Sequence, residues 1–298
     1  KSLSAEERLA AVQSSDIEQL HETNPLRDGL SESNPQRFRV ERPKSSFASW
    51  YQFFPRSEGA YYGEDGKIVP GNLKTSIAGL ERAAAEGFNI VYLPPIFPIG
   101  VTNRKGRNNS LVAGPNDPGS PFGIGSELGG HDTVDPQLGT MDDFKAFCER
   151  AHELGLEIAL DFALQCSPDH PWVKAHPNWF RTKPDGTIAF AENPPKKYQD
   201  IYPIDFNADM EGIEKEVERI MDLWVKAGVT IFRVDNPHTK PVRFWQDVIA
   251  AVTKKHPEVL FLAEAFTRPG MMRALSYVGF TQSHCYFPWR DTKEELEE

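Results

Sequence analysis

The sequence predicts an α/β fold built around a parallel sheet, and two observations lead to this prediction. Between residues 47 and 298, six short apolar segments alternate with six amphipathic segments of helical period. The apolar segments are apolar on both faces, which is typical of parallel strands that helices cover on each side. This alternation fits a (β/α)8 barrel present through its sixth unit, and it fits a doubly wound sheet equally well.

The predicted elements can be placed in order along the chain. Strands are expected at residues 47–54, 88–96, 156–164, 229–234, 259–266 and 280–287. Helices are expected at residues 73–86, 140–154, 210–227, 241–255, 270–278 and 291–298. Thr140 and Asp143 form a capping pattern at one helix start. Gly87, Gly155 and Gly228 each follow a helix and precede a strand, where a left-handed residue is commonly needed.

The first 45 residues differ from the rest of the chain. They are polar and charged, and Ser4–Glu7 has the pattern of a capped helix start, with Leu9, Val12 and Ile17 at roughly helical spacing. We expect residues 1–45 to be the tail of a preceding domain with its linker, and residues 46–298 to be a truncated catalytic barrel. The chain begins without Met and ends inside a predicted helix, so we expect it to be part of a longer polypeptide.

Two long inserts interrupt the alternation, at residues 97–139 after the second strand and at residues 165–209 after the third. Both leave the carboxyl end of a strand, where parallel α/β folds bind ligands, and loops of this length are usually functional. The second insert contains aromatic residues that either stack on sugars or form the insert's own small core. These residues are Trp172, Trp179, Phe180, Tyr198 and Tyr202.

Composition excludes some classes of function. The formal net charge of −10 argues against a nucleic-acid-binding protein, which needs a basic face. The three cysteines have no C-x-x-C spacing, the N-terminus has no apolar signal segment, and no apolar run approaches the roughly 20 residues that span a bilayer. We therefore expect a cytoplasmic protein. Because nucleotide-binding and metal-binding motifs are absent from the sequence, we expect no cofactor and no metal.

Arg233 and Asp235 are the first candidate site residues. They lie two positions apart at the end of a predicted strand, so their side chains point the same way. An arginine beside an aspartate favours the ionised carboxylate, which a nucleophile at an anomeric carbon requires. The other interpretation is a buried structural ion pair.

Glu264 and Asp161 also interrupt apolar strands. Glu264 ends the strand after that of Asp235, and its apolar surroundings would raise its pKa, as a general acid requires. Together with Asp235 it would place two carboxylates at one rim, although a strand-end carboxylate can also simply meet solvent. Asp161 needs a buried partner, for which Arg233 is the candidate, and a structural role suits it best.

The two inserts contain basic residues at the same rim, including Lys105 and Lys196. Short basic runs are usually solvated surface, but here they favour an anion site. Lys105, Lys196, Tyr198 and Asn236 could supply the cations and hydrogen-bond donors that a sugar phosphate needs.

The chain resembles the α-amylase family, glycoside hydrolase family 13, in four segments that occur in the family's order. These segments are residues 134–144, 158–161, 232–235 with His238, and 261–264. The resemblance implies a (β/α)8 barrel and a retaining mechanism, with Asp235 as nucleophile, Glu264 as general acid/base and Arg233 orienting the nucleophile. A third family carboxylate, in a His-Asp pair further along, has no counterpart in these 298 residues.

Two departures from the family pattern resemble its maltosyltransferases. Gln165-Cys166 replaces the usual Asn-His, and Asn236-Pro237 replaces a small residue after the nucleophile. Residues 103–109 and 194–203 are also similar to that group. The resemblance implies substrate-binding positions at Lys105, Gln165, Asp200, Asn236, Tyr198, Lys196, Asp161 and His238.

The activity implied is retaining transfer of maltosyl units from a maltose 1-phosphate donor to the non-reducing end of an α-1,4-glucan acceptor, with phosphate released. The resemblance also implies a homodimer, and neither nucleic acid nor a membrane is expected as a partner. Two alternatives stay open. The first is an α-glucan hydrolase or another transglycosylase of the same family. The second is a non-catalytic glucan-binding or scaffold protein, against which the presence of both Asp235 and Glu264 argues.

Overall fold

The computed structural model describes residues 3–25, 27, 29–31, 33–34 and 40–297, which fall into two units divided between Val40 and Glu41. The first unit contains α1 (Ala5–Val12) and α2 (Ser15–Thr23). The Ser4 hydroxyl accepts from the Glu7 amide at 3.1 Å, and the Glu7 carboxylate accepts from the Ser4 amide at 2.7 Å, so the predicted capping box is present. The domain boundary at residue 45 stays a prediction, and part of the 1–45 segment lies outside the described residues.

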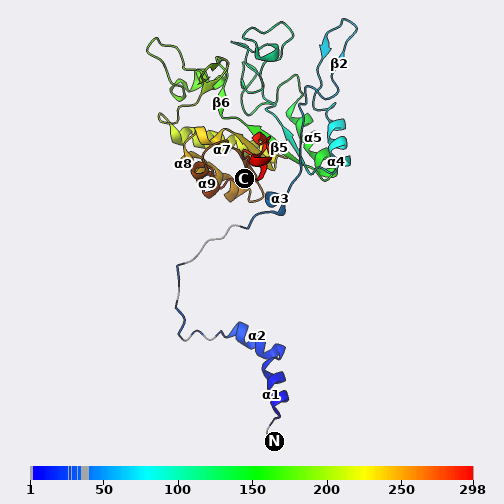
Figure 1. Ribbon diagram of the computed structural model, residues 1–298, viewed down its shortest axis with the longest axis vertical. Helices are drawn as coiled ribbons and strands as arrows, with labels where there is room; N and C mark the ends of the chain where they lie inside the picture. Colours follow the sequence, from blue (N-terminus) through cyan, green and yellow to red (C-terminus); the bar gives the residue numbers. More distant parts are fainter. Residues whose placement is uncertain (1–2, 26, 28, 32, 35–39, 298) are drawn as a thin grey trace. The chain divides into compact units, whose positions relative to one another are not determined.

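The second unit is built on one six-stranded sheet, whose strands are all parallel and follow the order of the chain (Figure 1). A doubly wound sheet would reverse its strand order at a switch point, so this order confirms winding of the barrel type. The strands are β1 (Trp50–Gln52), β4 (Ile90–Leu93), β5 (Glu157–Phe162), β10 (Ile231–Asp235), β11 (Leu260–Glu264) and β12 (Gln282–Ser283).

Each strand is followed by a helix, as the sequence pattern predicts. The helices are α4 (Ile77–Ala85), α5 (Met141–Glu153), α7 (Met210–Lys226), α8 (Val242–Lys255), α9 (Pro269–Tyr277) and α10 (Lys293–Glu297). A short helix, α3 (Pro43–Ser46), precedes β1. The glycine after α7 is required for two reasons: Gly228 has a φ of +110°, and a Cβ there would lie 2.6 Å from the Cβ of Cys148 on α5. The last residue of the helix predicted at 291–298 lies outside the described part of the chain.

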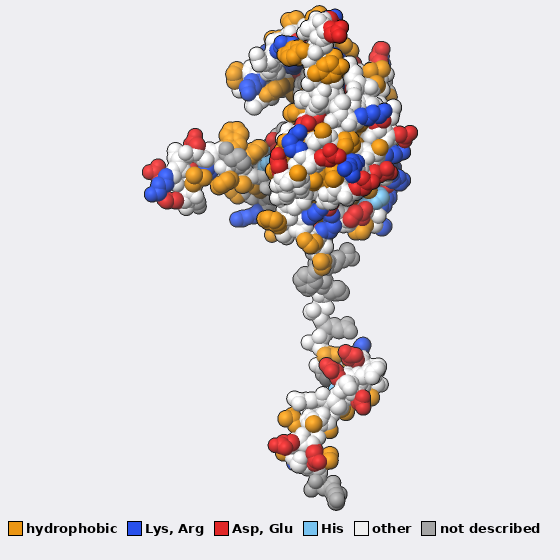
Figure 2. Space-filling model, turned by 90° about the vertical axis from the view of Figure 1, so that its right-hand side faces the viewer, with side chains coloured by type: hydrophobic (Ala, Val, Ile, Leu, Met, Phe, Trp, Pro, Cys, Tyr) orange, Lys and Arg blue, Asp and Glu red, His pale blue; other side chains and the backbone are white. Residues whose placement is uncertain are grey.

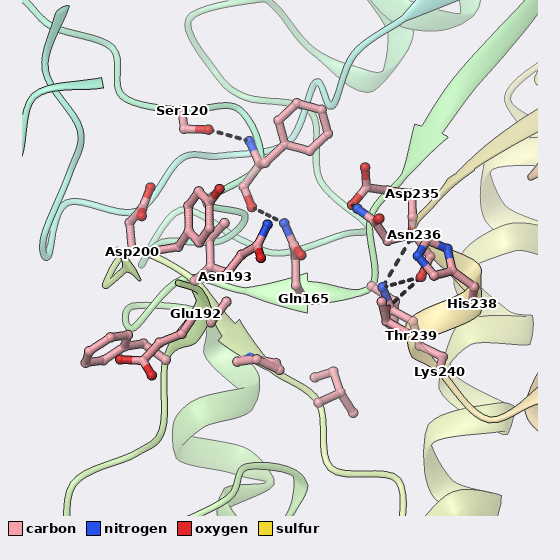
Figure 3. Close-up of a pocket in the computed structure, with 18 of the residues that line it drawn as sticks. Ser120, Gln165, Glu192, Asn193, Asp200, Asp235, Asn236, His238, Thr239 and Lys240 are labelled. Carbon is pink, nitrogen blue, oxygen red and sulfur yellow. Dashed lines mark hydrogen bonds between the residues drawn. The ribbon is translucent and has the colours of Figure 1, made fainter. Parts of the chain in front are cut away.

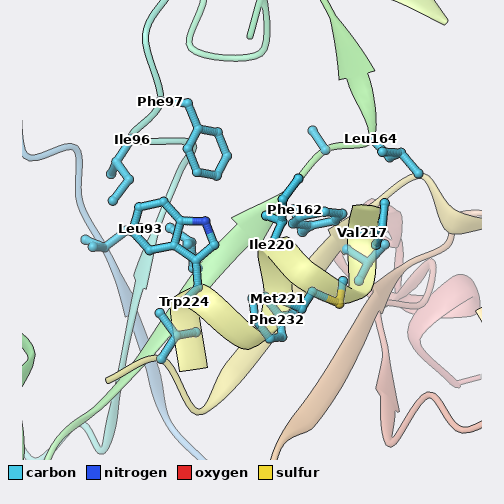
Figure 4. Packing of buried hydrophobic residues seen from close by; sticks show 14 of the residues in the cluster. Leu93, Ile96, Phe97, Phe162, Leu164, Val217, Ile220, Met221, Trp224 and Phe232 are labelled. Atoms are coloured by element: carbon cyan, nitrogen blue, oxygen red, sulfur yellow. The ribbon is translucent and has the colours of Figure 1, made fainter. Parts of the chain in front are cut away.

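Alternation along the strands divides the apolar residues between the two faces of the sheet. One face packs against the helices in a core that includes Phe162, Phe232 and Trp224 of α7 (Figure 4). The other face carries a smaller cluster, to which four strands each contribute one fully buried residue: Ile90, Ala159, Ile231 and Leu260. Because side chains alternate along a strand, Arg233 and Asp235 share the face of Ile231, above this small cluster.

Two long connections leave the carboxyl ends of β4 and β5. The first, residues 94–140, contains η1 (Arg107–Asn109); the second, residues 163–209, contains β6 (Gln165–Cys166), α6 (Pro171–Ala175), η2 (Pro177–Trp179), β7 (Ala191–Asn193), β8 (Lys196–Tyr198) and β9 (Tyr202–Pro203). A separate hairpin of β2 (Tyr61–Tyr62) and β3 (Ile68–Val69) follows β1.

The two connections are joined directly. The Asp169 carboxylate accepts from the backbone amides of Val101 and Thr102, each at 2.7 Å. Gly100 lies so close to Ser167 that a Cβ would be 2.4 Å from the serine Cβ. The long connections therefore form one wall above the carboxyl ends of the strands.

Acidic and basic side chains are interspersed over the face shown in Figure 2. In the described residues, no helix has both the length and the apolar character needed to cross a bilayer. Cys148, Cys166 and Cys285 are all free thiols, of which the first two are buried.

Candidate active site

Asp235 ends β10 and contacts Arg233, two residues earlier on the same strand. The Nη1 of Arg233 lies 3.0 Å from the Oδ1 of Asp235 and 2.8 Å from the Oδ2 of Asp161, which lies beside Arg233 in the register of β5 and β10. The predicted pairing of Asp161 with Arg233 is therefore present. Because this guanidinium contacts both carboxylates, it compensates for burying two acids on adjacent strands.

Glu264 ends β11 and is the direct neighbour of Asp235 in the parallel register of β10 and β11. Its Oε1 lies 3.5 Å from the Nη2 of Arg233, so a single guanidinium reaches three carboxylates. Burial raises the pKa of Glu264 above its ordinary value of 4.5, and the nearby positive charge of Arg233 opposes this shift. The environment therefore favours a protonated Glu264 to a higher pH than in water.

Asn236 bridges the two strand ends. It adopts the left-handed conformation, with φ 43° and ψ 52°, which asparagine tolerates better than most residues. Its backbone amide donates to the Oε2 of Glu264 at 3.1 Å, and its side-chain amide donates to the Oδ2 of Asp235 at 3.2 Å. Both carboxyl groups are thus held by the same residue as well as by Arg233.

Asp161 is fully buried beneath these groups. Its Oδ2 accepts hydrogen bonds from Arg233 and from the hydroxyl of Tyr92 on β4. Burial raises the pKa of Asp161 to about 7, with the charge of Arg233 opposing and that of Asp235 adding to the shift. Asp161 therefore helps to fix the position of the Arg233 guanidinium through their ion pair.

A cavity of about 800 Å³ opens beside Asp235 (Figure 3). Its lining comes from the carboxyl end of β10, the turn after it and both long connections. Of the residues that the sequence singles out, six line this cavity: Gln165, Tyr198, Asp200, Asp235, Asn236 and His238. Gln165 is held by its side-chain amide, which donates to the Phe122 carbonyl at 3.1 Å.

Other predicted binding residues lie outside this lining. The ammonium of Lys105 is buried between the two connections, 3.2 Å from the Gln199 side-chain oxygen and 3.8 Å from the Oδ1 of Asp200. Lys105 thus does not line the cavity itself, but it pairs with Asp200, which does. Lys196 is exposed on β8, in the same hairpin as the lining residues Asn193 and Tyr198.

Sequence reasoning missed Lys240, which lines the cavity. Its ammonium donates to the backbone carbonyl oxygens of Asp235 and Asn236, each at 3.2 Å. Burial lowers the pKa of Lys240 to about 8, while the charges of Asp235 and Glu264 act in the opposite direction. Its only signal in the sequence is its position, five residues after Asp235.

The aromatic residues of the second connection divide between the two interpretations. Trp172, Trp179 and Phe180 are each less than 8% exposed and pack into the main hydrophobic core. Tyr198 is partly exposed and lines the cavity. Tyr198 is therefore accessible for sugar stacking, whereas the three buried rings are not.

His131, Cys166 and His170 are the group of described residues whose ligand atoms lie close enough for a metal ion. Their hydrogen bonds fit a different role. The Nδ1 of His170 accepts from the Trp172 amide, so its Nε2 carries the proton and donates to the Nδ1 of His131 at 3.0 Å. The Nε2 of His131 then donates to the Ala163 carbonyl at 2.9 Å. Metal binding would break this chain, so we assign a structural linkage.

No family model matches the chain, but curated relatives match all of it. The chain is 86% identical over its full length to an α-1,4-glucan:maltose-1-phosphate maltosyltransferase of Bifidobacterium longum, and covers 40% of that protein. It is 81% identical over its full length to the enzyme of the same name from Bifidobacterium animalis subsp. lactis, covering 41% of it. The protein of this name from Mycobacterium tuberculosis is 55% identical over 98% of the chain, which covers 41% of it. The chain thus spans about two fifths of the length of these relatives.

Solved structures of α-amylases share the fold. An α-amylase from Lactobacillus plantarum matches with a TM-score of 0.60 and 29% identity, over 84% of this chain and 50% of the amylase chain. A maltogenic α-amylase from Thermotoga neapolitana matches with a TM-score of 0.62 and 26% identity, over 86% of this chain and 55% of the other. The chain therefore belongs to the α-amylase family, and over its whole length it is homologous to the maltosyltransferases named above.

Proposed function

We propose that the full-length protein transfers maltosyl units from α-maltose 1-phosphate to the non-reducing end of α-1,4-glucans, with retention of configuration and release of phosphate. The observation that carries this proposal is the 86% identity, over the entire chain, to a protein named for this reaction. The proposal further takes residues 46–298 as the barrel part of the enzyme. It also includes the substrate-binding roles given above to Lys105 and Lys196, whereas the fully buried Asp161 would act on the substrate only through Arg233.

In the proposed first step, a carboxylate oxygen of Asp235 attacks the anomeric carbon of the donor. A bond forms between that oxygen and the carbon as the bond to the phosphate oxygen breaks, which gives a β-maltosyl enzyme. Arg233 and Asn236 hold the two oxygens of Asp235. This contact pattern supports a nucleophile that is held in a fixed position.

Glu264 is the proposed acid and base. It gives its proton to the departing phosphate, and then takes the proton of the acceptor's 4-hydroxyl as that oxygen attacks the anomeric carbon. The second inversion restores the α configuration. Direct pairing of Asp235 with Glu264 in the strand register supports the short separation that a retaining pair needs, about 5–5.5 Å.

The cavity lining supports recognition of a polar donor. Gln165, Asp200, Asn236 and His238 present amide, carboxylate and imidazole groups, and Tyr198 adds an aromatic face. The two joined connections would screen the maltosyl enzyme from water, as a transferase requires.

The test is to incubate the purified full-length protein with α-maltose 1-phosphate and maltohexaose, and to measure phosphate and product length. Phosphate should be released in step with chain growth by two glucose units, and omission of the acceptor should suppress it. If reducing sugar appears from maltohexaose alone, without phosphate, the protein is instead a hydrolase of the same family.

Sedimentation would test the proposed homodimer. Localisation of a tagged protein would test the proposed cytoplasmic location, which the three free thiols favour.

A further inference from the structure

We infer that Lys240 is a positioning residue, which holds Asn236 in the conformation that bridges Asp235 and Glu264. This inference rests on the proposed function and deepens it. Its starting point is the six-residue segment from Asp235 to Lys240, in which the lysine side chain folds back over the end of β10. Figure 3 shows its ammonium directed at the backbone oxygens of Asp235 and Asn236.

The turn has to hold a left-handed residue at a defined place. If Asn236 left this conformation, its backbone amide could no longer donate to Glu264 while its side chain donates to Asp235. Thr239 contributes to the turn, since its hydroxyl donates to the Asn236 carbonyl at 2.7 Å. Trp245 anchors the other side, because its indole nitrogen donates to the Pro237 carbonyl at 3.0 Å. Lys240 adds a further restraint, because its ammonium donates to the backbone oxygens of both Asp235 and Asn236.

Within the described part of the chain, the buried ammonium of Lys240 has hydrogen-bond partners but no direct ion-pair partner. Burying an ammonium is costly unless a partner offsets the cost, and among the described residues no carboxylate lies within ion-pair distance of Lys240. Its contacts are two carbonyl oxygens, which a neutral donor could also satisfy. The nearby acids Asp235, Glu264 and Asp161 act on it only through space, and Arg233 and His238 are further charged or titratable groups near this turn.

A positioning role predicts different activities for two variants of Lys240. Lys240→Gln keeps an amide that can donate to both carbonyls, whereas Lys240→Met keeps the approximate length of the side chain and removes every donor. If position is what Lys240 supplies, the glutamine variant should retain far more activity than the methionine variant. If the positive charge is what matters, both variants should fall equally.

The experiment compares these two variants of the full-length protein with the wild type and with Lys254→Met, which removes an exposed lysine from α8. Lys240→Met should lower kcat with α-maltose 1-phosphate by about 100-fold, with little change in KM, because misplacement of a catalytic group affects the chemical step. Lys240→Gln should remain within about tenfold of the wild type, and Lys254→Met should match it. A crystal structure of Lys240→Met should show Asn236 outside the left-handed region.

Three outcomes would overturn the inference: an unchanged kcat in Lys240→Met, a raised KM at constant kcat, or an equal loss in the two Lys240 variants. A wild type that does not use α-maltose 1-phosphate would instead reject the proposed function. In that case the crystal structure still tests the position of Asn236, and thermal denaturation of each variant separates misfolding from a local effect.

Discussion

Asp235 and Glu264 are direct neighbours in the register of β10 and β11, and both carboxyl groups contact Arg233 and Asn236. The two groups are therefore fixed relative to one another by adjacent strands and by two shared partners. Differences in their surroundings make different chemical roles possible for the two groups.

The two carboxylates should fail in different ways when replaced. Asp235→Asn should abolish formation of the covalent intermediate, because no carboxylate is left to attack. Glu264→Gln should slow transfer to a glucan by about 10²–10⁴-fold, but should still form the intermediate from a donor with a good leaving group. Mass spectrometry of Glu264→Gln after incubation with such a donor should locate the adduct on the peptide that contains Asp235. An adduct on another peptide would refute the assignment of the nucleophile.

The rate should depend on the protonation of Glu264. Because burial raises the pKa of Glu264 above 4.5, the protonated acid should persist to higher pH than in an exposed glutamate. The value of kcat/KM should therefore fall on the alkaline side, with a midpoint above 4.5. The Glu264→Gln variant should lose this limb when the rate is measured from pH 5 to 9 with the activated donor. A limb of unchanged midpoint in the variant would assign it to another group.

Contact between the two long connections should matter for activity more than for overall stability. Gly100→Ala would place a Cβ 2.4 Å from the Cβ of Ser167, so the connections would have to separate. Gly270→Ala is the matched control, because a Cβ there meets nothing within 4 Å and Gly270 has an ordinary φ. We expect Gly100→Ala to raise the KM for the donor several-fold, and Gly270→Ala to leave it unchanged. Equal KM values for the two variants would show that separating the two long connections does not affect donor binding.

The buried imidazole pair should make stability depend on pH. Burial lowers the pKa of His131 to about 4, so the folded protein keeps this residue neutral while the unfolded chain protonates it below its ordinary value of 6.5. The contribution is complete above pH 6.5 and is lost as pH falls towards 4. It amounts to about 3 kcal/mol, since one pKa unit corresponds to about 1.36 kcal/mol.

Chemical denaturation between pH 4 and 7 would measure this effect. A His131→Gln, His170→Gln double variant should show a smaller decrease in the free energy of unfolding than the wild type over that range. His152→Gln, which removes an exposed imidazole of α5, should keep the wild-type slope. A double variant with the wild-type slope would assign the decrease to carboxylates.

Much of this architecture can be predicted from the sequence because it depends on local pattern. Apolar segments that end in Asp235 and Glu264 identify two strands and the rim where they end. Parallel register then brings the two residues together without further information. Arg233 is equally predictable, because residues two apart on a strand share a face.

Other parts of the site depend on contacts that the sequence pattern does not encode. The left-handed conformation of Asn236 is a choice among several that asparagine allows, and the path of Lys240 depends on a long side chain folding back. Lys105 is a clear case, since its place in a basic run does not reveal whether its side chain is exposed. The packing of two distant connections buries it beside Asp200. Such long-range packing is also what separates the buried Trp179 from the accessible Tyr198.

The contacts around Arg233 also set an electrostatic balance at the carboxyl ends of β10 and β11. Three acids, Asp161, Asp235 and Glu264, surround two cations, Arg233 and Lys240, so the group carries one excess negative charge when every member is ionised. A single proton neutralises it, and a partly buried set of charges favours neutrality. When that proton is on Glu264, the electrically neutral form of the site is also the form that begins the proposed reaction.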